Sequence, residues 1–432
     1  MTTTSYVNRR QRLLQKMQRG LAIIPSAPEV TRNADTHYDY RQDSYFYYLS
    51  GFNEPEAMLV LIAGDVPQSI LFCREKNLER EIWDGFRYGP DAAKTNFGFD
   101  AAYPISQFEE KLIELMADQP TLFFPIGHHP AFDAQILKCR ESVKAKARSG
   151  ISAPSSLQDS RELLNGMRLI KDASEIATMR RAAQISCDAH RRAMKFTRPG
   201  QFEYQVEAEL LHEFCRHGAR QPAYTSIVAS GANACTLHYV GNKSQLNDGD
   251  LLLIDAGCEL DGYAADITRT FPINGRFSPI QRDVYQIVLA AQTAAIAAAR
   301  PNNHWNQPHE SALEILAQGF IDLKLCAGSI ESVLTSESYK PFYMHRTGHW
   351  LGMDVHDVGD YKVNGEWRKL QAGMTLTIEP GCYIRPADNV PREFWNIGIR
   401  IEDDVLITEQ GCDVLTAAAP KTVADIEELM KS

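Results

Sequence analysis

Two aspartates flank a short polar turn near the middle of the chain, in the stretch DAGCELDGYAADITRT. Asp255 follows the apolar run LLLI, and Asp266 follows the turn-like ELDG. If ELDG forms a four-residue hairpin loop, the two aspartates are cross-strand partners with Cβ atoms about 5 Å apart. A tighter turn centred on Asp261-Gly262 would instead pair Asp255 with Thr268, so the register is an assumption. Facing carboxylates repel unless they share a proton or bind a cation; alternatively, one is solvated and they never meet.

Two glutamates lie in similar apolar, strand-like sequence. Glu379 ends the strand pattern of TLTIEPG, and Glu402 lies in GIRIEDD with Arg400 on the same strand face. Carboxylates rarely occupy such positions without a partner. Asp403 and Asp404, which follow directly, are expected to be exposed. Together with the two aspartates, the glutamates form a candidate set of four carboxylates.

Histidines supply candidate nitrogen ligands. His345, His349 and His356 lie in HRTGHWLGMDVHDVG, and His238 lies in CTLHY. The spacing of His345 and His349 is that of HExxH zinc helices, but an arginine stands where the glutamate should be and Gly348 weakens a helix. Taken alone, His238 is more typical of a structural histidine than of a ligand.

Four carboxylates and one imidazole make an oxygen-rich, hard ligand set. Such a set suits Mn²⁺ or a similar divalent ion better than a structural zinc, which prefers cysteine and histidine. A ligand charge of about −4 exceeds that of one divalent cation and favours two bridged ions. Two such ions can hold a hydroxide between them and stabilise a tetrahedral intermediate. The sequence therefore predicts two divalent metal ions, with Mn²⁺ as the expected metal.

The first third of the chain alternates helix and strand patterns, which predicts an α/β layer with a mixed or parallel sheet. Its predicted elements are helices at 9–17 and 107–116 and strands at 21–24, 58–62, 69–72 and 121–124. A segment rich in Ser, Ala and Pro at 149–160 predicts a surface loop near a domain boundary.

The remainder of the chain predicts an α+β domain with helices outside and antiparallel strands inside. Capping signals predict three helices: a capping box starts one at 172–196, a C-terminal glycine ends one at 202–217, and Ser-Pro starts one at 279–299. Alternating patterns at 375–379 and 397–407 predict the strands that carry the two glutamates.

Composition bounds the function. The 432 residues are 44% hydrophobic and 23% charged, which is typical of a soluble globular protein with two domains. A net charge of −10 argues against nucleic-acid binding. Nine scattered cysteines without a CxxC pair predict reduced thiols and a cytoplasmic location. Neither a signal peptide nor a membrane span is expected, since no suitable apolar run occurs.

Several separated motifs resemble those of the Xaa-Pro aminopeptidases, metallopeptidases with the pita-bread fold, and most of all bacterial aminopeptidase P. They are DAGCELDGYAADITRTFP, HWLGMDVHDVG, TLTIEPGCYI and GIRIEDDVLIT, with further likeness upstream in EVTRNADTHYDYRQDSYFYYLSGFNEPEA, EIWDGFRYGPDAA and EFCRHGARQPAYTSIVASGANACTLHY. The resemblance covers nearly the whole chain. It implies an α/β creatinase-like N-terminal domain, 1–166, and an α+β pita-bread catalytic domain, 167–432.

The resemblance also implies the residues of a dinuclear site, usually of manganese. The metal ligands carried over by motif position are Asp255, Asp266, His349, Glu379 and Glu402, of which Asp266 and Glu402 bridge the ions. The residues implied to line the substrate pocket and to assist proton transfer or transition-state binding are His238, His345 and His356, joined by Arg400 and Tyr383.

Relatives of this type are often tetramers or dimers, so a homo-oligomer is expected. Trp83, in EIWDG, matches a tryptophan that such relatives lend to a neighbour's active site; a packed or surface aromatic is the alternative. Two features depart from the family pattern: HRTGHW brings Arg346 near the pocket, and the segment 301–343 has no clear counterpart.

The expected activity is release of the N-terminal residue from peptides with proline in second position, through a hydroxide that bridges two metal ions. Glu379 would carry the proton to the proline nitrogen, and His345 or His356 would stabilise the tetrahedral oxygen. Prolidase, with the same fold and metals but restricted to dipeptides, is the alternative. A non-catalytic pita-bread binding protein is a further one, although such proteins typically lose ligands that this chain keeps.

Overall fold

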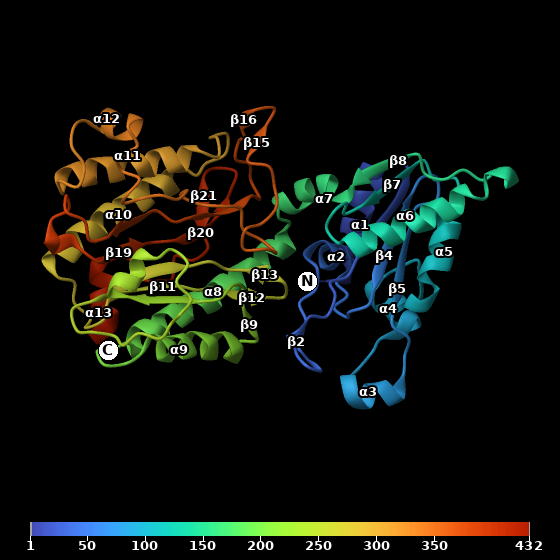
Figure 1. Ribbon diagram of the computed structural model, residues 1–432, viewed down its shortest axis with the longest axis horizontal. Helices are drawn as coiled ribbons and strands as arrows, with labels where there is room; N and C mark the ends of the chain where they lie inside the picture. The colour runs from blue at the N-terminus through green and yellow to red at the C-terminus, as the bar shows by residue number, and fades with distance from the viewer. Residues whose placement is uncertain (1, 432) are drawn as a thin grey trace. The chain divides into compact units, whose positions relative to one another are not determined.

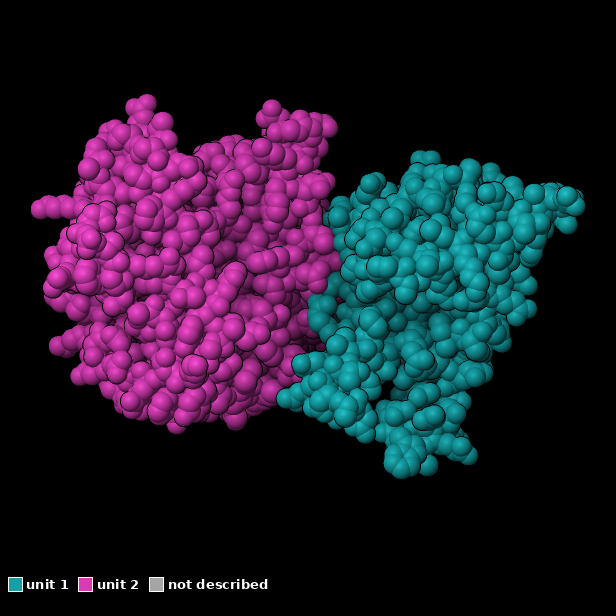
Figure 2. Space-filling view, in the orientation of Figure 1, with its two compact units in different colours: residues 1–167 teal, residues 168–432 magenta. Residues whose placement is uncertain are grey.

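The computed structural model describes residues 2–431. The chain falls into two units, residues 1–167 and 168–432, which Figure 2 colours separately. The elements of the first unit are α1 (Thr3–Met17), β1 (Gly20–Pro25), β2 (Thr31–Asn33), β3 (Thr36–His37), α2 (Ser44–Ser50), β4 (Met58–Ala63), β5 (Gln68–Cys73), α3 (Leu78–Asp84), α4 (Gly89–Phe97), β6 (Ala101–Pro104), α5 (Phe108–Leu115), β7 (Thr121–Phe124), α6 (Pro130–Lys144), β8 (Ser156–Asp159) and α7 (Ser160–Leu169), whose end crosses the boundary.

A six-stranded sheet in the order β6-β5-β4-β1-β7-β8 forms the centre of the first unit (Figure 1). β1 pairs antiparallel with β4 and parallel with β7, so the sheet is mixed. Buried apolar side chains of these strands, such as Leu21, Ile23 and Leu122, pack against α5 and α6 through Leu112 and Ile136. The predicted α/β layer with a mixed sheet is confirmed.

The second unit begins with two long helices and continues into short strands. Its elements are α8 (Ala173–Phe196), α9 (Glu203–Arg216), β9 (Gln221–Pro222), β10 (Ile227–Ser230), β11 (Leu251–Asp255), β12 (Cys258–Leu260), β13 (Tyr263–Ala264), β14 (Thr268–Pro272), α10 (Pro279–Ala298), α11 (Gln307–Asp322), α12 (Ile330–Thr335), β15 (Lys362–Val363), β16 (Glu366–Trp367), β17 (Thr375–Ile378), β18 (Gly381–Ile384), β19 (Ile397–Arg400), β20 (Asp403–Ile407), β21 (Cys412–Val414) and α13 (Val423–Lys431).

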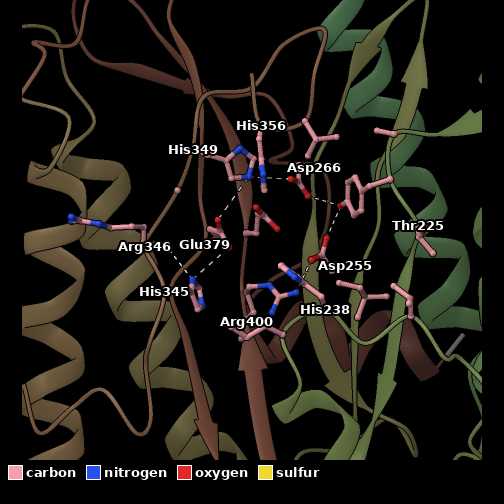
Figure 3. A pocket seen from close by; sticks show the side chains of 18 of the residues that line it. Thr225, His238, Asp255, Asp266, His345, Arg346, His349, His356, Glu379 and Arg400 are labelled. Carbon is pink, nitrogen blue, oxygen red and sulfur yellow. Dashed lines mark hydrogen bonds and ion pairs between the residues drawn. The ribbon is translucent and has the colours of Figure 1, made fainter. Parts of the chain in front are cut away.

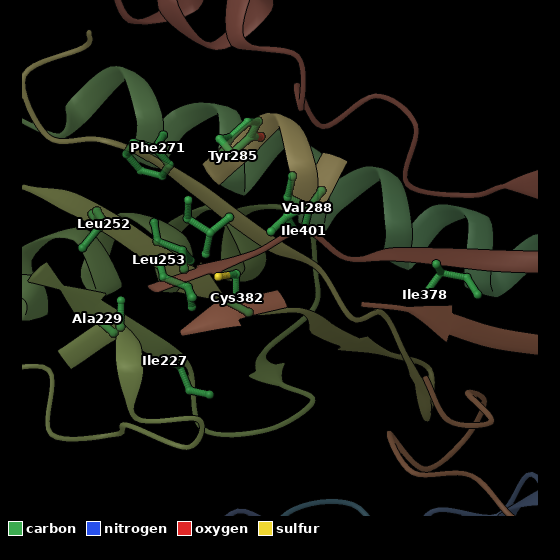
Figure 4. Packing of buried hydrophobic residues seen from close by; sticks show 14 of the residues in the cluster. Ile227, Ala229, Leu252, Leu253, Phe271, Tyr285, Val288, Ile378, Cys382 and Ile401 are labelled. Carbon is green, nitrogen blue, oxygen red and sulfur yellow. The ribbon is translucent and has the colours of Figure 1, made fainter. Parts of the chain in front are cut away.

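Helices cover the antiparallel strands of this unit, as predicted. The sheets are β10-β11-β14, β13-β12-β9, β17-β20-β21 and the pairs β18-β19 and β15-β16. α8 and α9 pack on β9, β10, β12 and β13, and α10 packs on β17, β18 and β19. One apolar core joins these layers; in Figure 4, Leu253 of β11, Val288 of α10 and Ile401 lie among its buried members.

Capping signals place the helices where the sequence predicts them. Asp172 caps α8 by accepting hydrogen bonds from the backbone N–H groups of Ser174 and Glu175. In turn, the Glu175 side chain accepts a hydrogen bond from the backbone N–H of Asp172. Ser278 caps α10 in the same way, with Pro279 as its first residue. These helices form the frame against which the strands of the site are packed.

The hairpin between the two aspartates has the tighter of the two possible turns. β12 and β13 pair Leu260 with Tyr263, so the loop consists of Asp261 and Gly262 alone. Both have positive φ, 50° and 79°, as a type I′ turn requires. Glycine adopts this conformation freely, and aspartate tolerates it better than most residues.

This turn moves every cross-strand partner by two residues from the assumed register. In the β11–β14 ladder, Asp255 therefore pairs with Thr268, the second of the two registers left open by the sequence, and the assumed pairing with Asp266 does not occur. Because side chains alternate along a strand, a shift of two residues keeps the same face. Asp266 lies just before β14 and still approaches Asp255, but across the hydroxyl of Tyr224 rather than across a ladder.

Asp403 and Asp404 are fully buried at the start of β20, so the prediction that they are exposed is wrong. Asp403 accepts hydrogen bonds from Arg269 Nη2 at 2.7 Å and Lys421 Nζ at 2.6 Å. Burial alone would raise the pKa of Asp403, but these cations lower it to about 2. Asp404 accepts the backbone N–H of Asp266 at 3.1 Å, which positions a predicted ligand. The strand pattern could not reveal cationic partners that come from β14 and from the C-terminal segment.

Candidate metal centre and active site

Three side chains from distant parts of the sequence converge in the second unit. Asp266, His349 and Glu402 each present one ligand atom, and these atoms all lie within 4.8 Å of one another. Asp266 is 5% exposed and Glu402 is 2% exposed. The elements that bring them together are the β13–β14 connection, the loop before β15 and the β19–β20 connection.

The other two predicted ligands border this cluster (Figure 3). Asp255 ends β11, and its Oδ2 accepts a hydrogen bond from Arg400 Nη2 at 2.6 Å. Glu379 follows β17; its Oε1 lies 3.8 Å from His349 Nε2 and its Oε2 lies 3.8 Å from His345 Nδ1. All five side chains therefore line one pocket.

A backbone contact orients His349 toward this cluster, and a side-chain hydroxyl orients Glu402. His349 Nδ1 lies 3.0 Å from the carbonyl oxygen of Trp350, which leaves Nε2 facing Asp266 Oδ2 at 3.4 Å. A Cβ atom on Gly348 would come within 2.0 Å of the Thr377 carbonyl oxygen, so only glycine allows the loop this close to β17. On the other side, Thr268 Oγ1 donates a hydrogen bond to Glu402 Oε2 at 2.6 Å.

The buried carboxylates raise one another's pKa values. Burial raises the pKa of Glu379 to about 7. Burial, followed by the charges of Asp266 and Glu379, raises the pKa of Glu402 well above its usual range, and burial also raises that of Asp266. For His349, burial alone would lower the pKa, but Asp266 and Glu379 outweigh it and raise it to about 9. This excess of negative charge, presented by hard oxygen donors and one imidazole, fits divalent cations.

The pocket has a volume of about 770 Å³. Its lining beyond the five side chains includes His238, His345, His356, Arg346, Arg400 and the apolar Leu237, Val240 and Val355. The carboxylates occupy one part of this lining, and the histidines and apolar side chains surround them (Figure 3). Such a combination of apolar walls and a few convergent polar groups is typical of a small-molecule or peptide site.

The other three histidines of the pocket, His238, His345 and His356, differ in the contacts that hold their rings. His345 Nε2 lies 2.9 Å from the Tyr383 hydroxyl, and its Nδ1 lies 2.7 Å from the Arg346 carbonyl oxygen. Burial, with the charge of Arg400, lowers the pKa of His345 to about 3. The rings of His349 and His356 have centroids 4.2 Å apart. His238 and His356 are both exposed to the pocket.

The remaining predicted side chains lie at varying distances from the centre. Tyr383 is fully buried behind the pocket, where its hydroxyl accepts a hydrogen bond from Arg400 Nη1 at 3.0 Å. Arg346 lines the pocket and donates a hydrogen bond to Asn306 Oδ1 at 2.6 Å, so the segment before α11 supports the rim. Trp83 lies on α3 in the first unit and is 83% exposed.

Comparison with known proteins identifies this arrangement. Residues 177–409 match metallopeptidase family M24, and residues 6–123 match the aminopeptidase P N-terminal domain. The chain belongs to metallopeptidase family M24. It is 45% identical over 428 residues to the Xaa-Pro aminopeptidase of Escherichia coli, covering 98% of this chain and 97% of that relative.

Solved structures agree with this assignment. The Pseudomonas aeruginosa aminopeptidase PepP superimposes with a TM-score of 0.98 at 49% identity, covering 100% of this chain and 98% of that one. The zinc-substituted Escherichia coli aminopeptidase P in complex with product superimposes with a TM-score of 0.97 at 44% identity, covering 100% and 98%.

These likenesses confirm the predicted family, the two-part fold and the predicted enzyme, a Xaa-Pro aminopeptidase. They also agree with a site for metal, since the M24 family consists of metallopeptidases. Within the described part of the chain, no helix has the length and apolar character needed to cross a membrane.

One side chain of this M24 site was not singled out from the sequence. The Tyr224 hydroxyl lies 2.6 Å from Asp255 Oδ1 and 2.5 Å from Asp266 Oδ1. Burial, with the charges of both aspartates, raises the pKa of Tyr224 well above its usual range, so the hydroxyl keeps its proton. The only signal was its position in the stretch QPAYTSIV, just before the first residue of β10, the neighbour of β11.

We expect Tyr224→Phe to lower kcat/KM by about tenfold to a hundredfold, as loss of a partner of metal ligands typically does. The substitution removes the donor between Asp255 and Asp266 while keeping the ring. Steady-state kinetics with metal-saturated enzyme provides the measurement, and Tyr204→Phe, a half-exposed tyrosine on α9, is the matched control. Unchanged kinetics for Tyr224→Phe would show that the hydroxyl does not support the site.

Proposed function

We propose that the pocket cleaves the Xaa-Pro bond with two divalent metal ions, expected to be Mn²⁺. The proposed ligands are Asp255, Asp266, His349, Glu379 and Glu402. The observation that carries this proposal is the convergence of all five side chains on one pocket. Asp266, His349 and Glu402 form the tightest group of ligand atoms, so these three would hold the ions together with Asp255 and Glu379. When bound, the ions supply Lewis-acid activation of the attacking water and of the scissile carbonyl.

Glu379 is the proposed proton carrier. A carboxyl group at the edge of the ligand cluster can accept a proton from the attacking water and pass it on to the leaving nitrogen. The leaving group here is the proline nitrogen, which has no N–H in the peptide and must gain a proton to depart. Glu379 also lies between His349 and His345, at the edge of the ligand cluster and facing the pocket.

His345, His356 and His238 are the proposed partners of the substrate carbonyl and of the tetrahedral oxygen. A neutral imidazole can donate one hydrogen bond to a developing oxyanion. The low pKa of His345 keeps that ring neutral, and its contact with Tyr383 fixes its orientation. Arg400 joins Tyr383 to Asp255 and is proposed to hold both in place while lining the substrate pocket.

The size of the pocket favours peptides longer than two residues as substrates. A volume of about 770 Å³ lies in the range for drug-sized ligands and leaves space beyond a proline ring. The aminopeptidase reading therefore has more support than prolidase. A non-catalytic binding protein has less support, since the pocket keeps all five proposed ligands.

Glu379→Ala should lose more than about a hundredfold in turnover, beyond the effect typical of an outer partner of a metal ligand. The metal-free variant should be no less stable than the metal-free wild type, because the substitution removes a buried carboxylate whose ionisation is unfavourable. Peptide hydrolysis and thermal unfolding of both forms are the measurements.

Two comparisons sharpen the Glu379→Ala experiment. Glu409→Ala, at an exposed position, should match the wild type in both assays. Asp255→Ala should lose turnover and also stability, because it leaves the buried Arg400 without its carboxylate. Turnover retained by Glu379→Ala in metal-replete buffer would contradict the proposed role.

We also propose that the protein is a homo-oligomer, a dimer or tetramer, in which Trp83 contributes to the substrate pocket of a neighbouring copy. An apolar surface on and beside α3 supports this proposal. Its residues and exposed fractions are Leu78, 72%, Ile82, 81%, Trp83, 83%, and Phe86, 64%. Four large apolar side chains this exposed are unusual for a monomer and typical of an interface.

Mixing two defective variants tests this proposal. If Trp83 acts in a neighbour's pocket, a Glu379→Ala copy can lend its tryptophan to the intact pocket of a Trp83→Ala copy. For a dimer with random exchange, a 1:1 mixture should recover about a quarter of the wild-type activity. Hydrolysis after subunit exchange is the measurement, with each variant alone as the control. Activity equal to the mean of the two separate variants would contradict the shared pocket.

The compartment and the domain boundary complete the proposal. All nine cysteines are unpaired, which supports a cytoplasmic location. The acidic charge of −10 supports the absence of a nucleic-acid partner. Domains at 1–166 and 167–432 agree with the division into units after residue 167.

A further inference from the structure

A buried carboxylate lies outside the ligand cluster and, among residues 2–431 that the structure describes, makes no ion pair. Glu203, the first residue of α9, is 0% exposed. Its Oε1 accepts hydrogen bonds from Ser230 N at 2.8 Å, Ser230 Oγ at 2.7 Å and Asn233 Nδ2 at 2.9 Å. Its Oε2 accepts hydrogen bonds from the Tyr239 hydroxyl at 2.8 Å and Ser244 N at 2.9 Å. All five donors are neutral groups.

These donors belong to a single segment, residues 230–244, which we call the His238 loop. The loop connects β10 to the turn before β11, the strand that ends in Asp255. Its side chains Leu237, His238 and Val240 line the pocket. The Glu203 carboxylate thus binds both ends and the middle of the His238 loop. Other side chains of the same loop line the pocket.

His238 depends on this loop more than the other pocket histidines depend on theirs. In the described part of the chain, its ring makes no hydrogen bond or ring contact that would fix it. By contrast, His345 contacts Tyr383 and a backbone carbonyl, and His356 lies against the ring of His349. The adjacent residue, Tyr239, is the one that Glu203 holds.

A second anchor limits how the loop can move. Asn242 is 4% exposed and has a φ of 44°, a conformation that asparagine tolerates. Its side chain accepts a hydrogen bond from Val228 N at 3.0 Å and donates one to the Ser226 carbonyl oxygen at 2.8 Å. Asn242 fixes the return of the loop to β10, which leaves Glu203 to hold the part that carries His238.

We propose that Glu203 is a positioning residue that acts through the His238 loop to hold His238 against the substrate. The proposal rests on the proposed function of His238 in the pocket. The negative charge of Glu203 is what the arrangement needs, because an ionised carboxylate accepts at both oxygens. The N-terminus of α9 contributes positive partial charge at the same place and so stabilises the carboxylate without a cation.

Glutamine cannot replace Glu203. Its side chain has the same shape, but one end carries N–H donors. The backbone N–H groups of Ser230 and Ser244 face opposite ends of the carboxylate, and neither can turn into an acceptor. Whichever way the amide is oriented, two donors face each other and one part of the loop is released.

A double-mutant cycle tests the proposal, with kcat and KM measured for a Xaa-Pro peptide on metal-saturated wild type, Glu203→Gln, His238→Ala and the double variant. We expect Glu203→Gln to lower kcat/KM by about tenfold, in the same parameter that His238→Ala changes. In the His238→Ala background, Glu203→Gln should cost less than about twofold further, because residues that act as one unit are not additive.

The controls separate positioning from a general loss of structure. Glu209→Gln removes a carboxylate from the same helix, where it pairs with the half-buried Arg192 away from the pocket, and should keep wild-type kinetics. If Glu203→Gln does not fold, Tyr239→Phe removes a single one of the five bonds and enters the same cycle. Thermal unfolding of each variant establishes that it is folded.

The kinetic results distinguish a failure of the role proposed for Glu203 from a failure of the role proposed for His238. An equal loss from Glu203→Gln in both backgrounds would overturn the proposal, because the effect would not pass through His238. Wild-type kinetics for Glu203→Gln would overturn it as well. If His238→Ala alone matches the wild type, the proposed function of His238 fails, and the role of Glu203 fails for that separate reason.

Discussion

The crowding of four carboxylates around one imidazole is the constraint on which the rest of the catalytic unit depends. Asp266 and Glu402 are almost fully buried, and Asp404 lies directly behind Asp266. Such a concentration of negative charge opposes folding unless cations and hydrogen-bond donors compensate it. The charges within the chain that do so are few, which is why divalent ions suit the site.

Cationic and hydroxyl groups from several elements around the cluster compensate the negative charge of the carboxylates. Arg400 pairs with Asp255, while Arg269 and Lys421 compensate Asp403 on the opposite side of the strand. The Tyr224 hydroxyl lies between the two aspartates. Each of these partners comes from a different element, so the compensation of the carboxylates depends on several strands and connections together.

The features of the fold and site that could be predicted from the sequence are those that depend on local patterns. Apolar strands ending in Asp255 and Glu379, and the capping box at Asp172, are readable because each depends on neighbours a few residues away. The five proposed ligands lie in motifs that the resemblance to the Xaa-Pro aminopeptidases picked out. The structure then brings these five side chains into one pocket.

The features of the fold and site that could not be predicted from the sequence depend on contacts between distant segments. The register at Asp255 depended on a choice between two turns that both contain Asp261 and Gly262, and the tighter one occurs. Tyr224 looks like any loop tyrosine until β10 pairs with β11. The burial of Asp403 depends on Arg269, which no alternation along β20 could indicate.

Glu203 is inconspicuous in the sequence for the same physical reason. A glutamate in the first turn of a helix is ordinary, and its five donors are spread over the loop before β11. Within the catalytic unit, buried acidic groups thus serve two purposes: those proposed to bind metal ions and those that fix backbone.

Metal stoichiometry combined with anomalous diffraction tests the central claim most directly. Protein saturated with Mn²⁺ and freed of excess should retain two ions per chain, and crystals should show both between Asp255, Asp266, His349, Glu379 and Glu402. Retention of no ion, or anomalous density away from these five side chains, would contradict the account that the carboxylate cluster exists to hold two cations.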